Sequence, residues 1–133
     1  MMAHQDDAFI DTLKGWRQQL HSFPEFGFEE KRTAAFVAQK LREFGLDEVV
    51  EGVGGTGVVG TLKRGNSNRA IALRADMDAL RITEQSDHSY KSRNDGVMHA
   101  CGHDGHTTML LGAAQQLAET GGLEGTGRVS VQP

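Results

Sequence analysis

Apolar residues near the start of the chain recur with the period of an α-helix. Phe9, Leu13, Trp16 and Leu20 are separated by four, three and four positions, so their side chains share one helix face. The segment SFPEFGF follows directly, and its proline ends the pattern. We therefore expect an amphipathic helix that ends near His21, whose ring would interact with the C-terminal end of the helix dipole.

A second helical period covers about residues 29–44. Ala34, Val37 and Leu41 lie on one face of this segment, and acidic residues stand in its expected first turn. Gly45 follows at the position where a left-handed residue would end the helix. The pattern therefore predicts two helices before the first strand.

The pattern then changes to short runs of apolar and β-branched residues. TGVVGTLK and AIALRA each predict a strand, and the polar segment RGNSNR between them predicts the connection of a β-hairpin. Residues 79–98 show no clear period. Residues 104–120 return to helical spacing, with Asp104 as the expected N-cap, and RVSVQP predicts a further strand. This order predicts an α/β fold, a sandwich in which helices cover a mixed sheet.

Length, charge and cysteine content exclude several classes of protein. The 133 residues correspond to one domain, and 14 basic residues against 18 acidic ones give a net charge of −4 without a basic cluster, so we expect no nucleic-acid partner. The N-terminus lacks the pattern of a signal peptide and no apolar run reaches the length of a membrane span, so we expect no membrane association. Cys101 is the only cysteine, which excludes an internal disulfide and fits a cytoplasmic location.

The segment MHACGHDGH concentrates side chains that bind metals or transfer protons. It holds three of the six histidines and the only cysteine of the chain. The residues of these types are His99, Cys101, His103, Asp104 and His106. Because scattered residues rarely gather so densely, we predict that this segment coordinates a metal ion.

A pair of acids provides the second half of the predicted site. Asp76 and Asp78 follow directly on the strand AIALRA and are two positions apart, so both project to one side of an extended backbone. Ligands of α/β proteins gather at the carboxyl ends of strands. We therefore predict a hydrolytic metal centre between these acids and the histidine-cysteine segment.

Each of these residues also has an ordinary structural explanation. The two acids are compatible with a helix cap or a turn, and a lone cysteine is commonly a small buried apolar residue. His99 and His106 fit hydrogen-bond partners that orient a metal ligand better than they fit ligands themselves. His4 and His88 are expected at the surface.

Three segments together resemble a known family. LHSFPEFGFEEKRTAAFVAQKLREFGL, LRADMDAL and GVMHACGHDGHTTMLLGAA stand in the order found in the N-terminal part of metal-dependent amidohydrolases and carboxypeptidases. This family includes hippurate hydrolases, N-acyl-L-amino acid amidohydrolases and plant auxin-conjugate hydrolases. The resemblance extends from about Trp16 to Pro133, and its histidine-cysteine segment is highly specific.

The resemblance implies an α/β/α sandwich of the zinc-exopeptidase type that is incomplete in this chain. Residues 1–133 would form the N-terminal part of the catalytic metal-binding domain, while the rest of that domain and an inserted lid domain would lie outside it. The family site holds two divalent metal ions, commonly manganese, zinc or cobalt. A homodimer or higher homo-oligomer of the full-length protein is also implied.

The family motif assigns roles to individual residues. Cys101, as a bridging thiolate, and His103 match metal ligands, and Asp78 matches the acid that polarises or orients the site. Related peptidases have a ligating histidine at the position of Asp76, and commonly a proline at the position of Arg81. The residues expected to surround the ligands, or to be ligands themselves, are Asp76, His99, Asp104 and His106.

The implied reaction is hydrolysis of the amide bond of a small-molecule substrate, an N-acyl amino acid such as hippurate, by a metal-bound water. In the family the last strand continues into Gln-Pro-Ala-Glu-Glu, whose first glutamate is the general base and second a ligand, whereas this sequence ends at Gln132 and Pro133. Two further histidine ligands of the family would lie beyond Pro133. We therefore expect this chain alone to be inactive, and an uncovered sheet edge to promote its association.

Two other classes of function are compatible with the same residues. A nucleophilic Cys101, activated by His103 or His106, would be inactivated by alkylation and insensitive to chelators. A non-catalytic metal-binding module or degenerate relative would bind metal without hydrolysis. A closed structural zinc site is disfavoured, because the sequence contains no second Cys or His pair with suitable spacing.

Overall fold

The computed structural model describes residues 3–133, with side chains from residue 6 onward. Its helices are α1 (Ala3–Ser22), α2 (Lys31–Glu43) and α3 (His103–Thr120), and its strands are β1 (Glu48–Val53), β2 (Gly57–Arg64), β3 (Ala70–Asp76) and β4 (Gly125–Gln132). All three helices expected from the sequence are present. The side chain of His4 lies outside the described part, and His88 is exposed as expected.

The second helix follows from its apolar spacing, with one correction at its start. Val37 and Leu41 are fully buried, as the helical pattern predicts. Glu29 and Glu30 precede α2 instead of occupying its first turn, which contains no acidic residue. Glu30 is the N-cap, with a non-helical ψ of 57°, and its side chain turns inward, where it is fully buried. Gly45 adopts a φ of 80° and ends the helix as expected.

The four strands form one mixed sheet in the order β1-β2-β4-β3. β1 pairs antiparallel with β2, β2 pairs antiparallel with β4, and β4 pairs parallel with β3. Val131 of β4 therefore lies between Val58 of β2 and Ala75 of β3. The mixed sheet predicted from the sequence is confirmed.

The predicted β-hairpin between TGVVGTLK and AIALRA is wrong, because β4 inserts between these two strands. Their connection is held instead by Glu124, whose Oε1 accepts the backbone amides of Asn66 and Ser67 at 3.0 and 3.2 Å. The observed hairpin joins β1 to β2. The sequence pattern does not predict β1, because its residues EVVEGV are exposed at all but one position and show no alternation.

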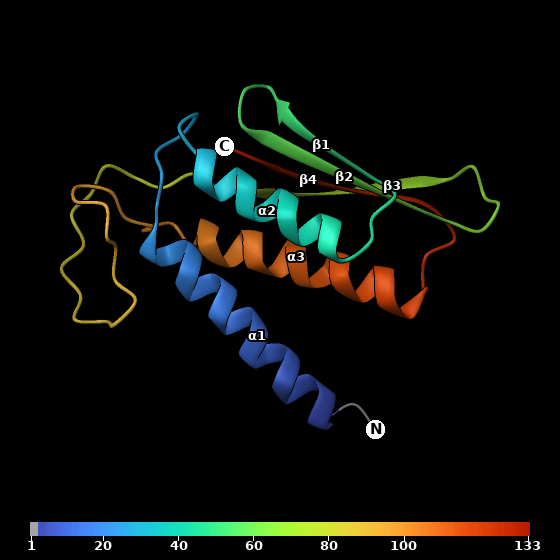
Figure 1. The fold of residues 1–133 in the computed structure, drawn as a ribbon, viewed down its shortest axis with the longest axis horizontal. Helices are drawn as coiled ribbons and strands as arrows, with labels where there is room; N and C mark the ends of the chain where they lie inside the picture. Colours follow the sequence, from blue (N-terminus) through green and yellow to red (C-terminus); the bar gives the residue numbers. More distant parts are fainter. Residues whose placement is uncertain (1–2) are drawn as a thin grey trace.

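Helices α2 and α3 cover one face of the sheet, and α1 packs against α3 (Figure 1). The core lies between these layers and contains apolar side chains from α2, α3 and three strands. Its fully buried members include Val37, Leu41, Val58, Leu111 and Val131. The described residues thus build the sheet and one helix layer of the expected sandwich.

The segment between β3 and α3, residues 77–102, is called the connecting loop below. Within the described chain it contains no helix or strand, and isolated bridges join Ala79 to Phe26 and Leu80 to Met98. The loop is therefore held against the turn after α1 and folds back on itself. Loops of this length without secondary structure are commonly functional.

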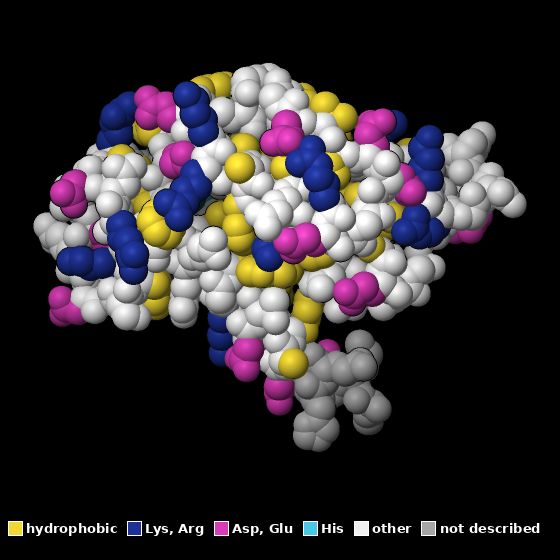
Figure 2. Space-filling model, viewed as in Figure 1, with side chains coloured by type: hydrophobic (Ala, Val, Ile, Leu, Met, Phe, Trp, Pro, Cys, Tyr) yellow, Lys and Arg dark blue, Asp and Glu magenta, His cyan; other side chains and the backbone are white. Residues whose placement is uncertain are grey.

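The surface combines charged residues of both signs with some exposed apolar side chains. Figure 2 shows lysine and arginine interspersed with aspartate and glutamate over the face in view. On β3, Ile71 keeps 57% and Leu73 39% of its surface exposed. Among residues 3–133, no helix combines the length and apolar character needed to cross a membrane.

Candidate metal centre

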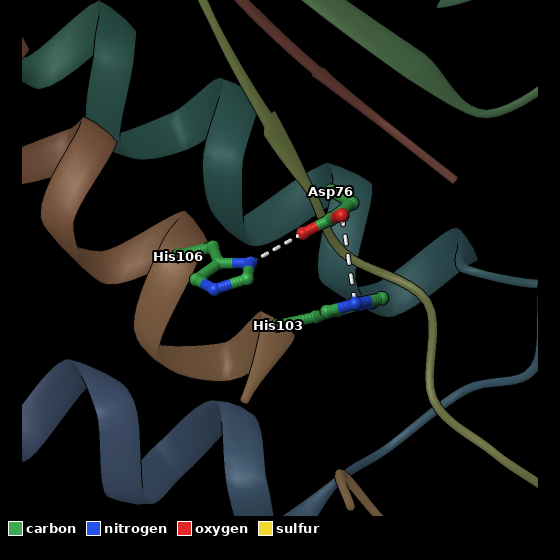
Figure 3. Close-up of side chains that lie close together, drawn as sticks. All are labelled: Asp76, His103 and His106. Carbon is green, nitrogen blue, oxygen red and sulfur yellow. Dashed lines mark hydrogen bonds and ion pairs between the residues drawn. The ribbon is translucent and has the colours of Figure 1, made fainter. Parts of the chain in front are cut away.

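Three predicted site residues converge where the end of β3 meets the start of α3 (Figure 3). Asp76 is the last residue of β3, and His103 and His106 lie at the start of α3. The Asp76 Oδ1 and His106 Nδ1 atoms are 2.7 Å apart, and the Asp76 Oδ2 and His103 Nε2 atoms are 3.5 Å apart. One ligand atom of each residue lies within 4.8 Å of the other two, so a single metal ion can contact all three.

The contact between α3 and β3 fixes this geometry. The buried Thr107 donates its hydroxyl hydrogen to the Asp76 carbonyl oxygen at 2.9 Å. Because β3 and β4 are parallel and α3 connects them, the N-terminus of α3 meets the carboxyl end of β3. This is the usual position of ligand sites in α/β proteins.

Asp78 holds His103 through the ring nitrogen that does not face Asp76. The Nδ1–H group of His103 donates to Asp78 Oδ1 at 2.8 Å and lies 3.0 Å from the Asp78 carbonyl oxygen. This tautomer leaves Nε2 free to bind a metal ion. Both acids of the predicted pair thus contact the same histidine.

Asp76 provides a negatively charged ligand atom at neutral pH. Partial burial alone would raise the pKa of Asp76, but the hydrogen bond from His106 and the charge of His103 outweigh burial and lower it below its ordinary value. One carboxylate and two imidazoles form a donor set that binds zinc and related divalent ions. The described residues therefore fit such an ion.

Cys101 does not belong to this convergent group. Its thiol is free and exposed, and Gly102, in the left-handed conformation with a φ of 81°, separates it from His103. Within the described chain, the residues placed to share one ion are Asp76, His103 and His106. The sequence predicts His103 as a ligand, and Asp76 and His106 as ligands or as residues that surround them. Metal binding by Cys101 stays a prediction.

His99 is buried near the site, with 4% of its surface exposed. Neither of its ring nitrogens has a hydrogen-bond partner among the described residues, so the expected orienting bond is not formed there. Burial lowers the pKa of His99 to about 4, although the Asp104 carboxylate opposes this effect. The imidazole is therefore neutral at neutral pH.

The prediction that Asp104 caps α3 is wrong. The N-cap is Gly102, no side chain caps the helix, and Asp104 is only 1% exposed. The Asp104 side chain turns inward because His21 and Arg17 of α1 both donate to its Oδ2 atom, at 2.8 and 3.1 Å. Asp104 thus connects α3 to α1.

The sequence pattern predicts His21 only as a partner of the helix dipole, whereas the structure places it in a buried network. Its Nε2–H group donates to Glu84 of the connecting loop at 3.0 Å. Burial alone would raise the pKa of Glu84, but hydrogen bonds from Ser86, Ser92 and His21 lower it to about 2. One feature of the sequence could have indicated this network. Arg17 and His21 are four positions apart beside the apolar face of the helix, so their side chains lie close together.

Arg81, which stands where the resembling family commonly has proline, anchors the connecting loop in another way. Its guanidinium group lies 4.1 Å from the ring centroid of Phe26 and 3.7 Å from a carboxylate oxygen of Glu29. The Ala79 amide also donates to the Glu25 carbonyl at 2.9 Å. These contacts hold the loop beside the site against the turn after α1.

Known proteins resemble this chain in sequence. The sequence model of Peptidase family M20/M25/M40 matches residues 72–133. A hippurate hydrolase from Campylobacter jejuni is 62% identical over 102 residues, which cover 77% of this chain and 26% of the relative. An N-acyl-L-amino acid amidohydrolase from Geobacillus stearothermophilus is 49% identical over 110 residues, which cover 83% and 29%. The chain thus spans less than a third of the length of either relative.

A solved structure shares the fold. The YxeP protein of Bacillus subtilis, a dinuclear metal-binding peptidase from the M20 family, matches with a TM-score of 0.90 at 39% identity. The match covers 96% of this chain and 36% of that protein. The α/β fold with its mixed sheet is therefore confirmed, as is the resemblance carried by the three sequence segments.

Proposed function

We propose that this chain, which resembles peptidase family M20/M25/M40 in sequence, forms the N-terminal part of the catalytic, metal-binding domain of an amidohydrolase. The full-length protein hydrolyses the amide bond of N-acyl amino acids. The observation that carries the proposal is the convergence of Asp76, His103 and His106, with Asp78 holding His103, at the carboxyl end of β3.

The proposed centre holds two divalent ions, manganese, zinc or cobalt. When bound, these ions would supply the polarisation of the acyl carbonyl and would lower the pKa of the attacking water. His103 is a ligand through Nε2, and Cys101 contributes a thiolate from the preceding loop. Asp76 and His106 complete or support this set, while Asp78 keeps His103 in the tautomer that binds metal.

The substrate class is inferred from the names of the relatives. The hippurate hydrolase and the N-acyl-L-amino acid amidohydrolase share 62% and 49% identity with this chain. We assign the general base, the remaining ligands and the lid domain to the rest of the full-length protein, which forms a homodimer or higher homo-oligomer. The enzyme acts in the cytoplasm, where the free thiol of Cys101 stays reduced.

Hydrolysis by the full-length protein tests this function. Purified protein is incubated with hippurate or with N-acetyl amino acids, and the released amino acid is measured before and after chelation. Manganese, zinc or cobalt is then returned separately. We expect a chelator to abolish the release and one of these ions to restore it. The isolated 133-residue chain is the matched control and should release no product.

Two outcomes would replace the proposal with another function. Metal binding by the full-length protein without hydrolysis of any acyl substrate would support a non-catalytic metal-binding module, which the three convergent ligand atoms also permit. Hydrolysis that survives metal removal and stops on alkylation would support a nucleophilic Cys101, whose thiol is exposed.

A further inference from the structure

A buried network of charged side chains links three segments beside the metal centre. His21, at the end of α1, lies between Asp104 of α3 and Glu84 of the connecting loop, and these side chains are only 4%, 1% and 2% exposed. His21 Nδ1 is 2.8 Å from Asp104 Oδ2, and His21 Nε2 is 3.0 Å from Glu84 Oε1. One imidazole thus joins the loop to the helix.

The network pairs charged groups and satisfies their hydrogen bonds. Both ring nitrogens of His21 face carboxylate oxygens, which accept hydrogen bonds. Arg17 provides a cation, because its Nε–H group also donates to Asp104. Charged groups are costly to bury unless they are paired in this way.

Asp104 connects the network to the first turn of α3. It directly follows His103 and precedes His106 by two positions. Its carbonyl oxygen accepts the Thr108 hydroxyl at 2.8 Å, while its carboxylate is held by His21. Any displacement of Asp104 would therefore move the helix turn that carries both imidazoles of the metal centre.

Glu84 connects the network to the connecting loop. Besides His21, its carboxylate accepts the hydroxyl of Ser86 and the backbone amide of Ser92, the latter at 2.8 Å. The Ser92 hydroxyl in turn donates to the Val97 carbonyl at 2.6 Å. The Glu84 carboxylate therefore holds, through hydrogen bonds, the part of the loop that leads back toward α3.

We propose that His21 is a positioning residue of the metal centre, which holds the first turn of α3 at a fixed place relative to the connecting loop. His21 acts through Asp104 on His103 and His106, and through Glu84 on the loop. This inference rests on the proposed function, because it assigns His21 to the support of a metal site. A residue that only stabilises the fold would not alter how the site binds metal in folded protein.

Cobalt titration of the metal-free, full-length protein tests this role, because the visible absorption of bound Co²⁺ reports the ligand geometry. His21→Gln keeps a donor but loses the ring that contacts both carboxylates, and Glu84→Gln keeps the shape of the side chain but loses its charge. Asp87→Asn is the matched control, since Asp87 is an exposed acid of the same loop. Circular dichroism and thermal unfolding show whether each variant is folded.

We expect both network variants, while folded, to bind Co²⁺ about tenfold more weakly with altered absorption bands, and Asp87→Asn to match the wild type. Wild-type affinity and bands in folded Glu84→Gln and His21→Gln, with only a lower melting temperature, would overturn the inference. If His21→Gln does not fold, Glu84→Gln alone decides. If the wild-type protein itself binds no Co²⁺, the proposed function fails together with the inference.

Discussion

At the scale of single residues, two carboxylates fix the orientation of His103. Asp78 fixes Nδ1 at 2.8 Å, and Asp76 lies 3.5 Å from Nε2. A carboxylate behind a ligating imidazole raises its basicity and holds the ring in place. In the proposed metal centre, Asp78 would therefore support His103 without needing to bind the ion itself.

Replacement of Asp78 tests whether its charge strengthens metal binding by His103. We expect Asp78→Asn to weaken Zn²⁺ binding by about 10-fold to 100-fold, because the amide keeps the size of the side chain but not its charge. Isothermal titration of the full-length protein measures the affinity. Asp87→Asn, at an exposed aspartate of the connecting loop, is the control. Equal affinities of the two variants would show that the charge behind His103 is dispensable.

Sequence reasoning finds residues that are concentrated in short segments and misses those that are paired over long distances. Asp76, Asp78 and His103 are predictable because each belongs to a dense motif beside a strand or helix. His21 is not, since its two carboxylate partners lie 83 and 63 positions away. Local periodicity contains no information about such pairs.

At the scale of elements, local patterns predict the helices and most strands but not the neighbours of each strand. β2 and β3 follow one another in the chain, yet β4 lies between them. Their order depends on the crossover through α3 and on the burial of Val131 between the two strands, which are long-range effects. The turn residues of RGNSNR are compatible with a hairpin of β2 and β3 and also with the observed order, in which β4 separates them.

The close approach of α2 to β2 predicts a steric effect at Gly60. A Cβ atom there would lie 2.6 Å from Leu46 Cδ2 and 3.0 Å from Leu41 Cδ1, so the core must shift. We expect Gly60→Ala to lower the free energy of unfolding by about 1–3 kcal/mol. Gly15→Ala in α1, where nothing lies within 4 Å, should raise it by about 0.5–1 kcal/mol. Urea denaturation measures both, and a stabilising Gly60→Ala would contradict the packing.

The hydrogen bond between His21 of α1 and Glu84 of the connecting loop predicts a specific response of stability to acid. Burial alone would raise the pKa of Glu84, but its hydrogen bonds lower it from 4.5 to about 2 in the folded protein. A lowered folded-state pKa contributes stability that is present above pH 4.5 and is lost as the pH falls toward 2. This shift corresponds to about 3 kcal/mol.

The stability of Glu84→Gln tests this linkage. The variant should be less stable than the wild type at neutral pH, and the difference should shrink as the pH falls from 4.5 toward 2. Urea denaturation of both proteins across this range gives the two curves. A difference that stays constant at every pH would show that the Glu84 charge is not the source of the stability.

At the scale of the whole molecule, the described residues leave one edge of β3 unpaired. Two apolar side chains of this edge strand, Ile71 and Leu73, are 57% and 39% exposed. Unpaired strand edges and exposed apolar residues both promote association between molecules. The 133-residue chain on its own therefore presents a surface that favours self-association.

We expect the isolated chain to associate as its concentration rises, and Leu73→Lys to reduce this association by placing a charge on the edge strand. Ile10→Lys is the matched control, because Ile10 is 46% exposed on α1. Size-exclusion chromatography with light scattering measures the mass. A wild-type chain that stays monomeric throughout would contradict the expectation.

The central claim is that this 133-residue chain carries ligands of a hydrolytic metal centre. It is tested most directly by the metal content of the full-length protein. Metal per chain is measured by mass spectrometry on the same samples used for hippurate hydrolysis. We predict two ions per chain and activity in the wild type and in His88→Ala, and loss of metal and activity in Cys101→Ala and His103→Ala. Stoichiometric metal and full activity in both of the last two variants would contradict it.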